Sequence, residues 1–267
     1  MPFTALHRLL GLGPGPLSDS MIDDAVTEKL AETDDLDFKS ALPGTSGLAA
    51  TDFPKDVAAM ANSGGGVILY GITEQDKKAG ARVDVGELSE GHERTLRMAA
   101  VTAISPPIFG LDVVRLGADG NRCVAIIVPA SVDGPHLIYR NDYFGAPVRN
   151  DADTVWMKER QIEAAYRARF DGRRQTAEVL DHMYKELSVV TEIEARAWLI
   201  AVGRPRVTPS SATRWEQDEA GQIFEAASVQ ALTYARRQSI RPFEIVQRRH
   251  PRPGLRRRVR NPSGVTP

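Results

Sequence analysis

The chain has 267 residues, of which 42% are apolar, and a formal net charge of −1. This composition excludes a disordered chain and suffices for one large domain, or a domain and a half. The single cysteine, Cys123, excludes an internal disulfide and predicts a core residue. No apolar run reaches eighteen residues and the N-terminus lacks a signal-peptide pattern, so we expect a cytoplasmic protein without membrane contact.

Charge is distributed unevenly along this nearly neutral chain. Residues 18–37 hold eight acids against the single base Lys29, whereas residues 236–260 hold ten arginines against the single acid Glu244. A basic end of this kind is typical of a nucleic-acid or membrane-surface contact, and equally of a solubilising tail.

The N-terminal part of the sequence predicts short helices alternating with strands. An amphipathic turn ends at the Gly/Pro stretch 13–16, and a helix follows an N-cap at Ser18. We expect a strand from Leu36, a helix over 53–61 that ends at an Asn-Ser-Gly-Gly-Gly turn, and a buried strand over 67–72.

The rest of the sequence continues this α+β pattern. The expected elements are a helix over 87–104, a hairpin of strands 111–116 and 122–131, short strands over 136–140 and 146–149, and a helix over 157–170. Segment 172–175 predicts a linker, and a helix over 176–187, a strand, a long helix and an unfinished hairpin follow it.

Three parts of the chain follow from these elements: an N-terminal helix and linker over 1–17, an α+β domain over 18–171, and a C-terminal α/β unit over 172–267. The elements predicted for the C-terminal unit would bury little apolar surface. This unit is therefore incomplete, completed by a partner such as a second copy in a homodimer, or the start of a longer protein.

The stretch AAMANSGGGVILYGI joins a helix to a strand through Gly64, Gly65 and Gly66. Glycine tolerates positive φ, and successive N–H groups in such a turn can bind an anion. The alternative is an ordinary helix C-cap with a tight turn. No GxxxxGK[ST] phosphate loop occurs in the sequence.

Joined to ETDDLDFK at 32–39, this stretch resembles the Schlafen AlbA-type domain family, which is widespread in bacteria and is also labelled a DNA-binding, divergent AAA or ATP-binding domain. The resemblance covers roughly residues 20–170. It includes ExxxxDFK, ANSGGG, the strand into YGI, VPAS, Pro135-His136 and PVRNDADTVWM. It implies a mixed sheet with flanking helices.

The resemblance also implies a metal site. In family members that cleave tRNA and rRNA, two acids of an ExxxxEFK string and a third after the glycine-rich strand hold a divalent ion, and these positions correspond to Glu32, Asp37 and Glu74. Such oxygen ligands suit Mg²⁺ or Mn²⁺, which can activate water at a phosphate that Lys39 contacts. Asp37 is one methylene shorter than the family's glutamate, and Asp76 is an alternative to Glu74.

Each of these residues also has a simpler interpretation. Glu32 can end a helix, Asp37 can point outward from a strand, and Lys39 can form an ion pair worth little free energy. Asp34 and Asp35 are expected in a solvated turn.

Further phosphate-binding candidates are Asn62, the three glycines, Arg140 and Arg149, with an exposed salt bridge as the alternative for each arginine. We predict that His136 forms structural hydrogen bonds and binds no metal, because no other His or Cys lies at ligand spacing. Three aromatic residues at helical spacing predict core positions rather than base-stacking platforms: Trp156, Tyr166 and Phe170.

We therefore expect a protein that binds the phosphate backbone of RNA or DNA, with metal-dependent endoribonuclease activity as the finer hypothesis. The alternatives are an ATP-binding regulatory module, in which the glycine turn receives phosphates, and a non-catalytic transcriptional regulator or scaffold. Convergence of the three acids would favour the enzyme, and a pocket over the glycine turn would favour nucleotide binding.

Overall fold

The computed structural model describes residues 3–140, 143–190, 202–203 and 222. The chain divides into two compact units, Met1–Ser211 and Ala212–Pro267, and every element below belongs to the first. The strand, long helix, unfinished hairpin and arginine-rich end predicted beyond residue 190 lie almost entirely outside the described residues.

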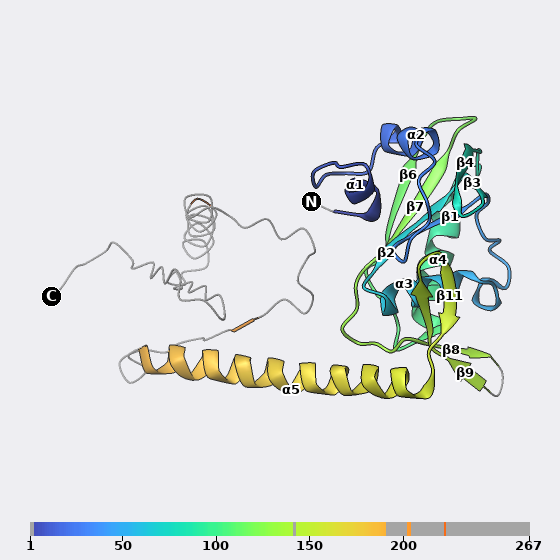
Figure 1. Ribbon diagram of the computed structural model, residues 1–267. Coiled ribbons are helices and arrows are strands. Elements are labelled where there is room, and N and C mark those ends of the chain that lie inside the picture. The colour runs from blue at the N-terminus through green and yellow to red at the C-terminus, as the bar shows by residue number, and fades with distance from the viewer. Residues whose placement is uncertain (1–2, 141–142, 191–201, 204–221, 223–267) are drawn as a thin grey trace. The chain divides into compact units, whose positions relative to one another are not determined.

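Five α-helices and eleven strands make up the described part of the chain (Figure 1). The helices are α1 (Ala5–Leu9), α2 (Asp19–Thr27), α3 (Phe53–Asn62), α4 (Glu90–Thr102) and α5 (Glu159–Val190), with a 3-10 turn at Leu48–Ala50. The strands are β1 (Leu36–Lys39), β2 (Gly66–Tyr70), β3 (Ile72–Gln75), β4 (Lys78–Arg82), β5 (Ile104–Ser105), β6 (Asp112–Leu116), β7 (Cys123–Val128), β8 (Leu137–Arg140), β9 (Tyr143–Gly145), β10 (Pro147–Asn150) and β11 (Asp153–Trp156).

A mixed four-stranded sheet in the order β1-β2-β7-β6 forms the centre of the domain. Strands β1 and β2 are parallel, and the other two pairs are antiparallel. Helix α3 supplies the crossover that a parallel pair needs. Smaller sheets are formed by β3-β4, β5-β8-β9 and β10-β11. The predicted α+β class, with a mixed sheet and flanking helices, is confirmed.

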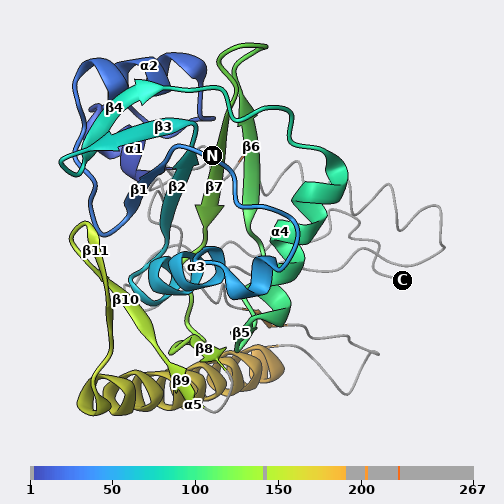
Figure 2. The same ribbon diagram turned by 90° about the vertical axis from the view of Figure 1, so that its right-hand side faces the viewer.

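Both faces of the central sheet are buried. Successive side chains of a strand point to opposite faces, so each strand contributes to two clusters. Ile68 and Ile126 belong to the cluster that contains α3 and α4, which Figure 2 shows in front of the sheet. Phe38 and Leu69 belong to the cluster that contains α1 and α2. Leu6 of α1 is fully buried there, so the segment predicted as a separate N-terminal helix packs on this sheet.

After the strand predicted over 67–72, the structure contains a hairpin that the sequence pattern does not predict. Strands β3 and β4 pair through a turn in which Asp76 and Lys77 have φ values of 53° and 60°. Two-residue hairpin turns favour positive φ at both central residues, and Gly and Asn are their usual signals. The sequence Asp-Lys carries neither, which is why its pattern does not predict this hairpin.

One continuous helix spans the segment that predicts a linker. Helix α5 runs from Glu159 to Val190, so the expected break at 172–175 and the expected boundary after residue 171 fall inside it. A single glycine such as Gly172 costs a helix only about 1 kcal/mol relative to alanine. In the described part of the chain, no helix combines the length and apolarity needed to cross a membrane.

Candidate functional site

Positive φ values and close packing together require the glycines at the junction of α3 and β2. Gly64 and Gly65 have φ values of 101° and 93°, and a Cβ on Gly65 would lie 2.7 Å from the backbone nitrogen of Ala130. The backbone N–H of Gly65 donates to the carbonyl of Met60 at 2.8 Å. A Cβ on Gly66 would also meet backbone atoms of another segment. The helix C-cap therefore explains this turn without a phosphate.

Asn62, at the end of α3, uses its side-chain amide to hold two distant segments. Its Nδ2 donates to the carbonyls of His136 and Pro147 at 3.0 and 2.8 Å, and its Oδ1 accepts from the backbone N–H of His136 at 2.8 Å. These bonds fix the beginnings of β8 and β10 to α3. The role is structural, whereas the sequence made Asn62 a phosphate-binding candidate.

Five charged side chains lie close enough to interact electrostatically around β1, and we call them the β1 charge cluster: Glu32, Asp37, Lys39, Asp56 and Arg149. Asp37 lies on β1, the edge strand of the central sheet, with its side chain on the face that α3 covers. The residues before and after it point to the opposite face. Asp37 Oδ1 accepts from Arg149 Nη1 at 3.2 Å, and both side chains are only 3% exposed. Lys39 Nζ pairs with the other oxygen, Oδ2.

Arg149 joins three parts of the domain. Its Nη2 donates to the carbonyl of Thr33, Nη1 also reaches the hydroxyl of Thr154 on β11, and its backbone N–H donates to Ser63 Oγ at 2.9 Å. The sequence offered a phosphate contact or an exposed salt bridge for this arginine. Arg149 instead forms a buried ion pair with Asp37, and this pair holds the β10-β11 hairpin on β1. The Arg140 side chain lies outside the described atoms.

Glu32 is buried beside this pair. Its Oε1 accepts the backbone N–H of Phe38 at 2.9 Å. Burial raises the pKa of Glu32, the bond from Phe38 opposes this, and the charges of Asp37 and Glu74 raise the pKa further. Glu74 itself is exposed on β3, where its Oε1 accepts the backbone N–H of Lys77. Asp34 and Asp35 occupy the expected turn.

Asp56 is a member of the cluster that the sequence did not single out. It lies on α3 three residues after the buried Phe53, on the apolar side of the helix, and that position was the available signal. Burial raises the pKa of its carboxyl to about 6, while Lys39 lowers it and Asp37 raises it. Burial lowers the pKa of Lys39, but the carboxylates of Asp37, Asp56 and Glu32 together outweigh this and leave that pKa raised.

These acids do not fit a divalent metal ion. Among the residues that the structure describes, no three His, Cys, Asp or Glu side chains are placed to share one. Glu32, Asp37 and Glu74 lie in one region, since the charges of the other two act on Glu32. However, Asp37 is neutralised by Arg149 and Lys39, and the other two acids accept backbone N–H groups.

His136 is confirmed as a structural hydrogen bonder. It is 1% exposed, with Nδ1 2.8 Å from the Pro106 carbonyl and Nε2 2.7 Å from Ser131 Oγ. The expectation for the aromatic residues was wrong in two cases. Trp156 is 50% exposed on β11 and Phe170 is 60% exposed on α5.

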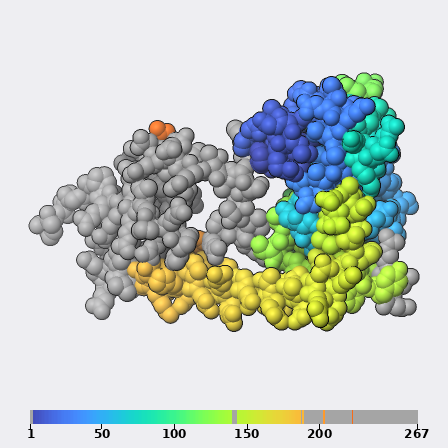
Figure 3. Space-filling view, in the orientation of Figure 1, coloured from blue at the N-terminus to red at the C-terminus, as the bar shows by residue number. Residues whose placement is uncertain are grey.

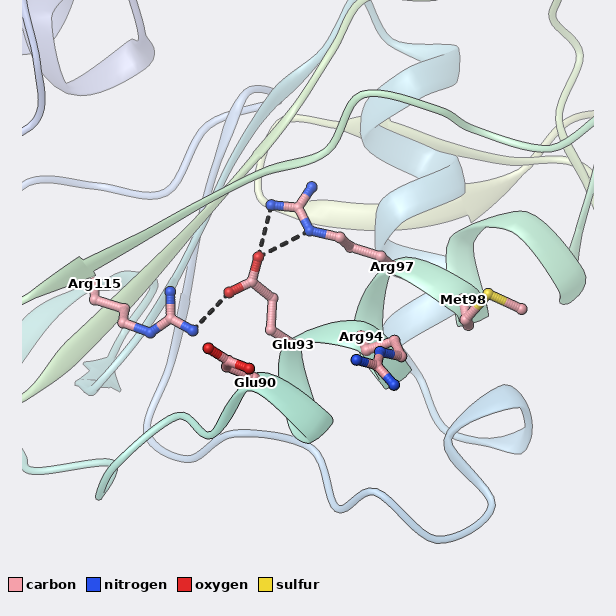
Figure 4. Close-up of a pocket in the computed structure, with 6 residues that line it drawn as sticks. All are labelled: Glu90, Glu93, Arg94, Arg97, Met98 and Arg115. Carbon is pink, nitrogen blue, oxygen red and sulfur yellow. Dashed lines mark hydrogen bonds and ion pairs between the residues drawn. The ribbon is translucent and has the colours of Figure 1, made fainter.

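A shallow hollow of about 470 Å³ lies on α4 and β6, away from the glycine turn. Figure 4 shows its lining: Glu90, Glu93, Arg94, Arg97, Met98 and Arg115. Glu93 pairs with both Arg97 and Arg115, at 2.8 and 2.6 Å. Arg97 and Arg115 thus share the single negative charge of Glu93, and none of the described residues that were predicted to bind phosphate lines the hollow.

Comparison with known proteins finds a similarity to one protein family. Residues 32–158 match the family model described as Schlafen, AlbA_2. No curated protein matches the sequence significantly.

Two solved structures are similar to part of the chain. The DIP2311 protein from Corynebacterium diphtheriae is 20% identical with a TM-score of 0.38, over 55% of this chain and 28% of that one. The N-terminal domain of a RecG-related protein from Nitrosomonas europaea is 16% identical with a TM-score of 0.37, over 54% of this chain and 94% of that one. We draw no functional inference from likenesses at this level.

Replacing Arg149 by methionine should leave Asp37 buried with Lys39 as its only cation. We expect the free energy of unfolding, measured with urea, to fall by about 3–5 kcal/mol. The matched control is Arg167→Met, which breaks the exposed pair with Glu163 and should cost less than about 1 kcal/mol. Equal losses in both variants would contradict a special role for the buried pair.

Asp56→Asn should change the pH dependence of stability. The unfolded carboxyl ionises near pH 3.8 and the folded one near 6, so the wild type loses stability as pH rises between these values. At pH 7 we expect the variant to be more stable by about 3 kcal/mol, and at pH 3 equally stable. Urea unfolding across this range checks it, with the exposed Asp119→Asn as the unchanged control. A variant less stable than wild type at pH 7 contradicts it.

Added Mn²⁺ should leave the thermal unfolding midpoint of the protein unchanged, because the candidate ligands are already engaged. Glu32→Gln is the matched variant, measured with and without the ion. Stabilisation by Mn²⁺ that disappears in this variant, together with Mn²⁺-dependent cleavage of tRNA, would restore the metal-dependent endoribonuclease hypothesis.

Proposed function

We propose, from the Schlafen AlbA_2 domain that this chain carries at residues 32–158, that the protein binds nucleic acid through the phosphate backbone. The observation that carries the proposal is an exposed excess of cations at the end of this domain and along the first half of α5. The basic end predicted at 236–260 would add to the same charge.

The segment 158–174 has six cations and three acids, a formal excess of three positive charges. The cations are Lys158, Arg160, Arg167, Arg169, Arg173 and Arg174, and the acids are Glu159, Glu163 and Asp171. One side of α5 is open to solvent along its described length in Figure 3. Attraction between such a surface and a polyanion requires no base sequence.

Lys158 and Arg160 are the best placed of these cations. Both are exposed, and neither forms an ion pair with any residue that the structure describes. Arg167 pairs with Glu163 at 2.6 Å, and Arg174 with Asp171 at 3.2 Å, both on the exposed surface. Because exposed ion pairs contribute about 1 kcal/mol or less, a phosphate can replace them at little cost.

The β1 charge cluster is a poorer phosphate site. It holds three carboxylates and two cations, and Asp37 already pairs with both of the cations. Lys39 is only about one-third exposed, at 37% of its side chain. We therefore assign the main phosphate contact to the start of α5 and a mainly structural role to Lys39.

Binding to a mixed-sequence oligonucleotide should depend on salt and on these two cations. For Lys158→Ala/Arg160→Ala we expect about five-fold weaker binding, and a slope of log affinity against log salt that is smaller by about 1.5. Fluorescence anisotropy over a salt series measures both quantities.

The matched control is Lys78→Ala/Arg94→Ala. It removes two exposed cations that form no ion pair with described residues, from other faces of the same domain. Equal weakening by both pairs would reduce the proposal to non-specific charge. No binding by the wild type at low salt would refute it, and ATP binding under the same conditions would favour the nucleotide alternative.

A further inference from the structure

The β8-β9 hairpin exposes three large aromatic side chains. Tyr139, Tyr143 and Phe144 are 56%, 66% and 55% exposed. Tyr139 and Phe144 are register partners, and their ring centroids lie 5.5 Å apart with a tilt of 40°. Figure 1 shows the hairpin projecting from the edge of the domain. Three exposed rings on two short strands are far more than the scattered apolar residues of an ordinary surface.

Trp156 extends this aromatic group from the neighbouring sheet. A Cβ on Gly145 would lie 2.6 Å from Trp156 Cε3, so the indole covers the backbone of β9 directly. Half of the tryptophan surface is still exposed. We call Tyr139, Tyr143, Phe144 and Trp156 the aromatic surface.

The aromatic surface has rings on both sides of the hairpin. Tyr139 and Phe144 share one side, because they are opposite each other in the register. Tyr143 is two residues from Gly145 and shares the other side with the glycine that Trp156 covers. A hairpin with rings on both sides cannot bury them all against its own domain, so these rings are available to a ligand.

Cations lie next to these rings. Lys158 and Arg160 follow Trp156 by two and four residues and form no ion pair with described residues. The backbone N–H of Met157 donates to the Ala146 carbonyl at 2.8 Å, which fixes this segment beside the hairpin. A ligand that matches this part of the surface has both flat apolar groups and negative charges.

We propose that the aromatic surface stacks against unpaired bases, so that the preferred ligand of this domain is single-stranded RNA or DNA. The inference rests on the proposed nucleic-acid binding and adds the substrate class. A single strand presents its base faces to aromatic side chains, whereas a duplex keeps them stacked on each other. The free cations beside Trp156 favour this anionic ligand over an apolar protein partner.

The test compares a single-stranded oligonucleotide with its duplex, in RNA and DNA forms, by anisotropy at fixed salt. We expect the wild type to prefer the single strand. Trp156→Ala and Tyr139→Ala/Phe144→Ala should each weaken single-strand binding about ten-fold, since one stacked base contributes roughly this much. Duplex binding and the salt slope should stay unchanged, because neither variant removes a charge.

Phe170→Ala is the matched control, because that ring is 60% exposed on α5 outside the aromatic surface. Trp156→Phe should retain most of the binding. If Trp156→Ala fails to fold, which its thermal unfolding would reveal, Tyr139→Ala/Phe144→Ala still decides the outcome.

The outcomes separate this inference from the proposed function. Equal binding of single strand and duplex, unaffected by the aromatic variants but weakened by Lys158→Ala/Arg160→Ala, overturns the stacking surface and leaves phosphate binding intact. Absence of all binding overturns both. Self-association of the wild type that the aromatic variants abolish, without any effect on nucleic acid, would identify a protein interface instead.

Discussion

The buried ion pair between Asp37 and Arg149 organises the region where the candidate functions were expected. A charged residue on the inward side of an edge strand is tolerated only with a partner, because an isolated buried charge costs several kcal/mol. Arg149 provides that partner and also bonds to the Thr33 carbonyl, so the pair fixes the β10-β11 hairpin, the turn before β1 and the sheet edge in one arrangement. The ion pair also positions the Trp156 part of the aromatic surface, because Trp156 lies at the end of the β10-β11 hairpin.

The same pair bears on the metal site that the family resemblance implies. All three acids at the implied ligand positions are present, but the cations that balance Asp37 belong to the protein itself. The exposed aromatic and basic side chains on which the two proposals rest lie elsewhere, on the β8-β9 hairpin and at the start of α5. This arrangement is consistent with the general rule that a fold hosts functions without determining them.

Much of the framework could be predicted from local signals. The N-cap position at Ser18, the strand from Leu36, the buried strand β2 and the glycine turn after α3 each follow from short-range physical chemistry, and the sequence predicts each of them. The β3-β4 hairpin was missed because Asp76 and Lys77 adopt positive φ without a glycine. The prediction of Trp156 as a core residue is wrong because helical spacing does not apply to this residue, which ends strand β11. The partner of Asp37 lies 112 residues away, a separation that no local pattern encodes.

That separation bears on the order in which the chain acquires structure during synthesis. Strand β1 leaves the ribosome long before Arg149 does, and until then Lys39 is the only cation of the cluster beside Asp37 on its own strand. Contacts between residues distant in sequence form late, since a long loop must first be closed. We therefore expect the edge of the sheet to remain loosely held in the nascent chain, and the domain to become fully rigid only when its last hairpin is synthesised.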